Sequence, residues 1–295
     1  MRRPKGLLVL LLAPAVFLWG LFMLGPALWG VSITFTNKAL TGPTAATAQF
    51  VGLANYRTLL QDPDFHAAVI RSLVFIIGSA ILGQGGLGLL LAVLTSERRR
   101  LWPRIRFSAW LATTVCYASW LVPEAVVGLV WLSYLDFEGV VNQGLRALGW
   151  SPIYWLVRFP MLAIILANVW WGTGWSMLLC KAALATIPHE IEEAAAVDGA
   201  SGWQQFLYVT LPLLRRPLLV DFILITIWTS GVLGLPLMLT HGGPGHRTEL
   251  MTLYAYRLGL ESFDLSYGTT VSIGILLVSL LLALLYYRLL EQDKA

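Results

Sequence analysis

The 295-residue sequence has few charged residues and almost no cysteine. Charged side chains make up 12% of the chain, against about 25% in an average soluble domain. Cys116 and Cys180 lie in apolar stretches without metal-ligand spacing, and the four histidines are scattered, which argues against a metal site. Neither a Gly-x-x-x-x-Gly-Lys-Ser/Thr phosphate loop nor a Ser/His/Asp grouping occurs. The chain by itself is therefore expected neither to hold ATP nor to be an enzyme.

Long apolar stretches take the place of charge. Hydrophobic residues make up 57% of the chain, and a helix of about 20 apolar residues crosses the hydrocarbon core of a bilayer. Stretches long enough to do so lie at 7–32, 67–95, 107–135, 159–183, 214–239 and 268–289. We interpret the first as an anchor rather than a cleaved signal peptide, because no clear small-residue cleavage pattern ends it. The sequence predicts an all-α polytopic membrane protein, with six transmembrane helices in a single domain over residues 1–295.

The distribution of basic residues predicts the orientation of these helices. Cytoplasmic loops hold an excess of Lys and Arg, and most of the 20 basic residues fall on one side of the predicted spans. That side holds Arg2, Arg3, Lys5, Arg98, Arg99, Arg100, Arg104, Arg106, Lys181, Arg215, Arg216, Arg288 and Lys294. Both termini and the polar segment at 188–217 are therefore expected to be cytoplasmic. Basic loops that face anionic lipid explain the pI of about 9.2 without a nucleic acid partner.

The first half of the segment Pro188–Pro217 has the pattern of a short helix that ends at a glycine. Pro188 suits the start of a helix, and Glu190, Glu192 and Glu193 place negative charge in the first turn, where the helix dipole favours it. Gly199 is expected to end this helix.

The second half predicts another short helix. Ser201 and Gln204 have the spacing of a capping box, and Trp203 and Phe206 give the helix an apolar face. Leu211–Pro212 is expected to close it. The two helices together predict an exposed helix-turn-helix at the membrane boundary that contacts a cytosolic partner. The alternative is an ordinary amphipathic loop in the headgroup region.

These residues resemble the EAA loop of binding-protein-dependent ABC importer permeases. The matching positions are Glu193-Ala194-Ala195, Gly199 and Val209-Thr210-Leu211-Pro212. A second match, Leu239–Gly245, is similar to the sugar-permease branch, of the maltose and glycerol-3-phosphate type. The resemblance covers nearly the whole chain and implies the six-helix type I importer permease fold in the cytoplasmic (inner) membrane of a bacterium or archaeon.

The resemblance also implies the partners. In that family the loop docks on the ATPase, so Glu193, Ala194, Ala195, Asp198, Gly199, Leu211 and Pro212 are expected to couple this chain to two ATP-binding subunits. ATP and Mg²⁺ would be bound by those subunits, and no cofactor by this chain. A second, similar permease and an extracytoplasmic solute-binding protein would complete the importer.

The candidate substrate path combines aromatic rings, hydroxyl groups and one carboxylate. Glu124 follows Pro123 within the third span, and Trp120, one turn earlier, is expected to share its helix face. A ring beside an acceptor suits a sugar, because the ring covers C–H groups and the acceptor takes hydroxyl protons. Two clusters, Trp170-Trp171-Gly172-Thr173-Gly174-Trp175 and Trp228-Thr229-Ser230-Gly231, offer further rings and hydroxyls and add Trp171 and Ser230. The resemblance adds Gly172, Trp228 and Thr229, although Thr229-Ser230-Gly231-Val232 stands where relatives often carry Asn, Phe or Asp.

Other interpretations of these residues remain open. Glu124 would also fit a pairing with the partner permease or a protonated carboxyl. Each tryptophan alone would equally suit packing between helices. Asp221, with Arg215 and Arg216, is expected to be interfacial and to orient the fifth span. The substrate is predicted to be a mono- or oligosaccharide; the alternatives are glycerol-3-phosphate or a phosphodiester, a polyamine, an amino acid, or an ATP-independent carrier.

Overall fold

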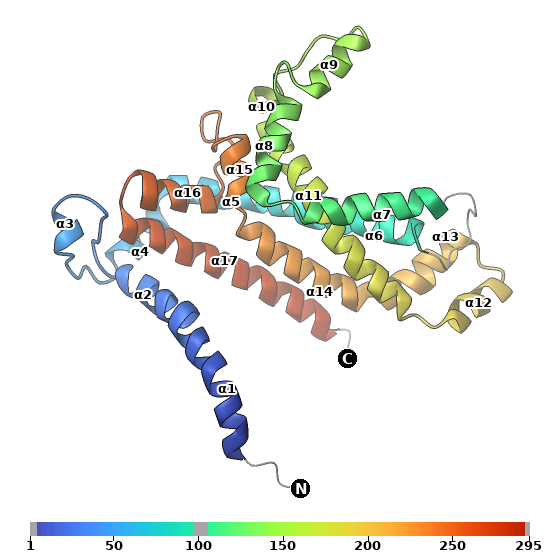
Figure 1. The fold of residues 1–295 in the computed structure, drawn as a ribbon, viewed down its shortest axis with the longest axis horizontal. Coiled ribbons are helices and arrows are strands. Elements are labelled where there is room, and N and C mark those ends of the chain that lie inside the picture. Colours follow the sequence, from blue (N-terminus) through green and yellow to red (C-terminus); the bar gives the residue numbers. More distant parts are fainter. Residues whose placement is uncertain (1–4, 97–105, 293–295) are drawn as a thin grey trace. The chain divides into compact units, whose positions relative to one another are not determined.

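The computed structural model describes residues 5–96 and 106–292, which are helical apart from loops and one isolated β-bridge between Thr36 and Phe50 (Figure 1). Several of the basic residues that predict the orientation of the spans lie outside the described residues: Arg2, Arg3, Arg98, Arg99, Arg100, Arg104 and Lys294. The chain divides into two compact units. Unit 1 comprises residues 1–66 and 254–274, and unit 2 comprises residues 67–253 and 275–295.

The helices are distributed over the two units as follows. Unit 1 contains α1 (Lys5–Trp19), the π-helical η1 (Gly20–Leu24), α2 (Gly25–Ile33), α3 (Pro43–Ala46), α4 (Ala54–Gln61) and the π-helical η5 (Arg257–Glu261). Unit 2 contains η2 (Ile76–Gly85, π-helical), α6 (Gly86–Leu94), α7 (Arg106–Trp120), α8 (Glu124–Leu135), α9 (Val140–Ala147), α10 (Trp155–Arg158), α11 (Pro160–Ala185), α12 (His189–Val197), α13 (Gly202–Gln205), η4 (Phe206–Thr210, π-helical), α14 (Leu211–Ser230) and α15 (Gly234–Leu239). Residues of α5 (Pro63–Phe75), α16 (Met251–Tyr256) and α17 (Leu265–Gln292) belong to both units.

Four of the described helical segments are long and apolar enough to cross a membrane: Leu12–Ile33, Pro63–Leu94, Pro160–Ala185 and Leu265–Arg288. The pair Ala109–Trp120 and Glu124–Ala147 would make a fifth, bent by 112°. The remaining predicted span, 214–239, corresponds to α14 and α15, with a break between them after Ser230. Every 18-residue stretch of the 20-residue α14 contains Arg215, Arg216 and Asp221, so its composition is less apolar than that of the other spans.

The third predicted span, 107–135, is bent, because the helix breaks at Pro123. A proline disfavours the helical conformation of the residue before it and cannot donate a backbone hydrogen bond. α7 therefore ends at Trp120, and α8 begins at Glu124 in a new direction (Figure 1). The indole of Trp171 donates to the carbonyl of Val122 at 2.8 Å and ties the break to α11.

α11 is the centre of unit 2, where it packs against α6, η2, α7 and α14. Glycines permit two of these close approaches. A Cβ atom on Gly174 would lie 2.0 Å from the carbonyl oxygen of Cys116 in α7, and one on Gly88 would lie 2.5 Å from the Cβ of Ser176. Around these crossings Met177, Cys180, Leu214 and neighbouring apolar side chains form a buried core.

Unit 1 is held by a partly buried polar cluster around Asp62, between α4 and α5. The Asp62 carboxylate accepts hydrogen bonds from the hydroxyls of Tyr254 and Tyr267. Burial by itself would raise the pKa of Asp62, but these two bonds and those from the backbone N–H groups of Phe65 and Asp64 outweigh it and lower the pKa. The ionised carboxylate therefore joins α4 and α5 to α16 and α17.

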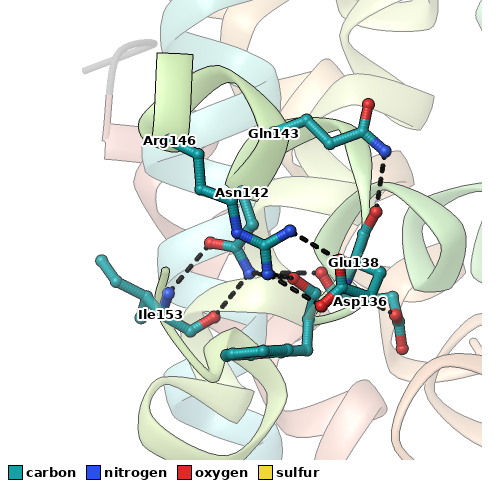
Figure 2. Close-up of polar contacts among 7 residues, drawn as sticks. Asp136, Glu138, Asn142, Gln143, Arg146 and Ile153 are labelled. Atoms are coloured by element: carbon teal, nitrogen blue, oxygen red, sulfur yellow. Dashed lines mark hydrogen bonds and ion pairs between the residues drawn. The ribbon is translucent and has the colours of Figure 1, made fainter. Parts of the chain in front are cut away.

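The connection between α8 and α11 is organised by Asn142, which the sequence analysis did not single out (Figure 2). Its buried amide donates to the carbonyls of Asp136, Phe137 and Ile153 and accepts from the N–H of Ile153 at 2.9 Å. Figure 2 also shows the exposed Arg146 guanidinium on the carboxylate of Glu138. The Asn142 side chain thus supplies hydrogen-bond partners for backbone groups of the loops before and after α9.

Candidate functional site

A cavity of about 260 Å³ in unit 2 brings together five of the predicted path residues: Trp120, Trp171, Gly172, Trp228 and Thr229. They come from the end of α7, the middle of α11 and the end of α14. Gln84, Asn168, Trp175, Ile225 and Val232 complete the wall. Of these, sequence reasoning missed Gln84 and Asn168 and noted Trp175 only as part of a tryptophan cluster.

Three tryptophans form a continuous aromatic surface on the cavity. The ring centroids of Trp120 and Trp175 are 5.2 Å apart, and those of Trp175 and Trp228 are 4.5 Å apart with a T-shaped arrangement. Trp175 is therefore the middle ring, and it links α7 with α14. Such rings offer flat apolar faces to the C–H groups of a ligand.

Two residues that line the cavity each have a buried polar atom without a hydrogen-bond partner within the described chain: Asn168, whose Oδ1 is an acceptor, and Trp175, whose Nε1 is a donor. The Asn168 Nδ2 donates to the Ser79 hydroxyl at 2.8 Å, and the Gln84 side-chain amide donates to the backbone carbonyl of Asn168 at 3.0 Å. Buried polar groups normally have partners. A ligand hydroxyl, which both donates and accepts, would satisfy either atom.

Gly172 is required where α11 passes the Gln84 side chain. A Cβ atom at this position would lie 2.3 Å from the Gln84 amide, well inside van der Waals contact. Gln84 is itself buried and hydrogen-bonded, so it has little room to move. The glycine thus keeps one wall of the cavity in place.

Glu124 lies outside the cavity, and the prediction that it shares a helix face with Trp120 is wrong. The two residues belong to different helices on either side of the break at Pro123. The Glu124 carboxylate instead accepts a hydrogen bond from the backbone N–H of Gly234 at 2.7 Å, at the first residue of α15. A carboxylate at this place caps an unpaired helical N–H and is favoured by the helix dipole.

Ser230 also lies outside the cavity wall. Its hydroxyl donates to the carbonyl of Ile227 at 2.7 Å and accepts from Ser279 of α17 at 2.8 Å. Both bonds are internal to unit 2, so this hydroxyl is engaged in packing α14 against α17.

The predicted coupling segment begins with α12, which ends as the sequence indicated. Gly199 has φ of +81°, in the left-handed region that favours glycine. The N–H of Ala200 bonds the carbonyl of Ala195, and the N–H of Gly199 bonds that of Ala196, which together make a Schellman motif. Glu193, Ala194, Asp198 and Gly199 are exposed, and the ring of His189 lies 3.4 Å from the carboxylate of Glu193.

The capping box of α13 is confirmed, but the predicted closure at Leu211–Pro212 is wrong. Ser201 and Gln204 exchange hydrogen bonds of 3.4 and 2.8 Å. The helix then continues through η4 into α14 without a stop. The N–H of Leu211 donates to the carbonyl of Phe206, which makes a wider, π-helical turn directly before Pro212. In a tighter α-helical turn the ring of Pro212 would clash with the preceding carbonyl.

Large apolar side chains are exposed along this segment. Val197 is 87% exposed and Tyr208 is 76% exposed, and the exposed ring of Trp203 lies beside that of Phe206. Exposed apolar groups of this size, next to exposed carboxylates, are typical of a surface that another protein covers.

The predicted interfacial position of Asp221 is wrong. Arg215 and Arg216 are exposed, but Asp221 is only 1% exposed, inside unit 2. The helix places it there because it lies one turn beyond the buried Leu218 and one turn before the buried Ile225. Sequence reasoning used the charge of Asp221 and not the periodicity of its neighbours.

This chain is similar to a known protein family and to several of its members. The family model for the binding-protein-dependent transport system inner membrane component matches residues 84–293. The sulfoquinovosyl glycerol transport system permease protein SmoG of Agrobacterium fabrum is 32% identical over 97% of this chain and 90% of its own length. The trehalose/maltose transport system permease protein MalF of Thermococcus litoralis is 34% identical over 81% of this chain and 79% of its own length.

A solved structure supports the fold. The crystal structure of a bacterial ABC transporter involved in the import of the acidic polysaccharide alginate contains a chain with a TM-score of 0.80 at 23% identity. The match covers 98% of this chain and 96% of that one. The predicted all-α fold of an importer permease is confirmed.

Proposed function

Because this chain belongs to the family of binding-protein-dependent transport system inner membrane components, we propose that it is a permease subunit of an ABC importer that moves a sugar across the cytoplasmic membrane. The observation that carries the choice of a sugar is the cavity of unit 2. It combines the aromatic surface of Trp120, Trp175 and Trp228 with the unpartnered acceptor of Asn168 and donor of Trp175. Rings for C–H faces and paired donors and acceptors for hydroxyls are what a sugar requires.

The names of the relatives agree with this choice of substrate. SmoG is a permease for sulfoquinovosyl glycerol, and the Thermococcus litoralis MalF is a permease for trehalose and maltose. Phosphate is a poorer fit for this cavity, because none of the described residues in its wall is Lys or Arg. We therefore place a mono- or oligosaccharide ahead of glycerol-3-phosphate, and no described residue of the wall is acidic, which disfavours a polyamine.

The path residues that we propose are Trp120, Trp171, Gly172, Trp228 and Thr229, with Gln84, Asn168 and Trp175 added. Glu124 and Ser230 are left out, since their polar atoms are engaged in capping α15 and in packing α14. Trp171 contributes mainly its ring, because its N–H is bonded to the break between α7 and α8.

The energy for transport is proposed to enter through the segment from α12 to the start of α14. Glu193, Ala194, Ala195, Asp198 and Gly199 would contact an ATP-binding subunit, which holds ATP and Mg²⁺. Leu211 and Pro212 would transmit the movement of the ATP-binding subunit, because they lie within the continuous helical rod that runs from α13 to the cavity residues Trp228 and Thr229. Rocking of this rod would open the cavity alternately to the two sides of the membrane.

The complete importer would contain further subunits. We propose a second permease, two ATP-binding subunits and an extracytoplasmic solute-binding protein, with both termini of this chain on the cytoplasmic side. An ATP-independent carrier is the less favoured alternative, since it would leave the exposed acidic and apolar surface of α12 and α13 without a partner.

The test is ATP hydrolysis by the co-expressed complex in lipid, stimulated by a panel of sugars with the solute-binding protein. Glu193→Ala is expected to lower the stimulated rate about tenfold, equivalent to about 1.4 kcal/mol of coupling free energy. Glu190→Ala is the matched control, because Glu190 is an equally exposed carboxylate of the same helix outside the matching motif. Absence of a co-purifying ATPase, or equal rates for the two variants, would refute the proposal.

A further inference from the structure

A second cavity, of about 460 Å³, lies between α11 and α14 nearer to the coupling segment. Its wall includes Cys180 and Ala183 from α11, Thr186 directly after α11, and Leu214, Arg216, Pro217 and Leu218 from α14. The same two helices therefore border both cavities of unit 2, one with aromatic and polar walls and the other mostly apolar.

Ser176 of α11 and Asp221 of α14 each lie between the two cavities along their own helix. Along α11, Gly172 borders the first cavity and Cys180 the second, and Ser176 lies one turn from each on the same helix face. Along α14, Ile225 borders the first cavity and Leu218 the second, with Asp221 between them on one face. The Ser176 hydroxyl and the Asp221 carboxyl are neighbours across the helix contact.

Within the described chain, the polar atoms of this pair have no hydrogen-bond partner beyond each other. Both carboxyl oxygens of Asp221 and the hydroxyl oxygen of Ser176 are buried. The neighbouring η2 and α6 contain no ionisable residue, and Gly88 of α6 lies directly against the backbone at Ser176. A carboxyl served by one hydroxyl alone is unfavourable in an apolar interior, so a role in holding the two helices together does not account for it.

We propose that Asp221 and Ser176 form a second binding step of the transport path, which takes hydroxyl groups of the sugar as it passes from the first cavity to the second. This inference rests on the proposed function. Two carboxyl oxygens accept from two neighbouring sugar hydroxyls, and the serine hydroxyl either donates or accepts. The step is closed in this structure, since Asp221 is 1% and Ser176 0% exposed.

Opening of the step requires α14 to shift against α11. α14 is continuous with α13 through η4, so a displacement of the coupling segment moves Asp221 directly. The pair would therefore become accessible during ATP turnover and be hidden at rest.

The experiment is thiol labelling of Ser176→Cys in the complete transporter in vesicles, with Cys116 and Cys180 replaced by alanine. A small water-soluble methanethiosulfonate is applied at rest, during ATP turnover, and during turnover with an excess of the sugar that stimulates hydrolysis. Ala68→Cys is the matched control, because Ala68 is fully buried in α5 of the same chain and borders neither cavity.

We expect Ser176→Cys to be labelled about tenfold faster during turnover than at rest, with slower labelling when sugar is present, while Ala68→Cys stays unreactive. Labelling that is absent in every state, or that is equal in every state and insensitive to sugar, would overturn the proposal.

Two Asp221 variants give an independent readout. Asp221→Asn retains one acceptor and should keep most of the sugar-stimulated hydrolysis, whereas Asp221→Leu should lower it about tenfold at unchanged co-purification of the ATPase. Equal rates for the two variants would overturn the binding step. Failure of the proposed function is seen separately, since the wild-type complex would then show no sugar-stimulated hydrolysis at all.

Discussion

Gly172→Ala is the substitution whose effect on the cavity follows most directly from the geometry. The added Cβ would lie 2.3 Å from the Gln84 side chain, where ordinary contacts begin near 3.4 Å. Gln84 is buried and donates to the carbonyl of Asn168, so it is expected to be displaced and to lose that bond. Overpacking of this kind costs about 1–3 kcal/mol and the lost hydrogen bond about 1 kcal/mol.

The displaced Gln84 side chain would also occupy the cavity. If about 2 kcal/mol of this cost falls on sugar binding, the sugar-stimulated rate of ATP hydrolysis falls about thirtyfold. The assay is this rate in proteoliposomes, with thermal unfolding of the complex measured in parallel to separate a folding defect from a cavity defect.

Two further variants test whether the clash with Gln84 causes the effect of Gly172→Ala. Gly86→Ala is the matched control, since Gly86 is also helical but has open space at its Cβ position; it should keep the wild-type rate. Gln84→Ala combined with Gly172→Ala removes the clash and should recover part of the lost activity, whereas additive losses would show that the two positions do not interact. A rate for Gly172→Ala equal to that of Gly86→Ala would refute the account of Gly172.

Three further predictions concern other parts of the chain. Gly199→Ala, at φ +81°, should cost about 1–2 kcal/mol of local stability and weaken co-purification of the ATPase, whereas Gly144→Ala, at an open helical position, should not. Asn142→Leu removes the five hydrogen bonds of a buried amide and should lower the Tm of the complex by several degrees, whereas Gln143→Leu, which loses one exposed bond, should change it little. Because the folded-state pKa of Asp62 lies below its ordinary value of 3.8, the ionised carboxylate stabilises unit 1 at pH above about 4, and this contribution is lost as the pH falls through the folded value. Tm measured between about pH 6 and pH 3 should therefore fall less steeply for Asp62→Asn than for wild type, and parallel curves would contradict this assignment.

The elements at 188–205 could be predicted because their signals are local. A glycine in the left-handed region, a capping box and a run of carboxylates in the first turn act within a few residues, and Gly199, Ser201 and Gln204 adopt the expected geometry. The predicted closure at Leu211–Pro212 is wrong because a π-helical turn before the proline lets the helix continue.

The candidate site was predicted only in part. Trp120, Gly172 and Trp228 were singled out from composition and resemblance, and the fold does bring them to one cavity. Gln84 and Asn168 were missed, because an isolated amide in an apolar stretch carries no local signal of a cavity. The hydrogen bond of Glu124 could not be predicted from local sequence either, because its partner Gly234 is 110 residues away in the chain.

The sequence by itself determined that this chain is a helical membrane protein, where most of its spans lie, and that a polar segment with defined caps connects two of them. These properties depend on hydropathy over about 20 residues and on capping within one helical turn, which neighbouring residues decide. The tertiary structure alone decided that three tryptophans meet at one cavity and that Asp221 is buried beside Ser176. Those facts depend on how distant helices cross, and glycines such as Gly88 and Gly174 set those crossings through contacts that no local pattern encodes.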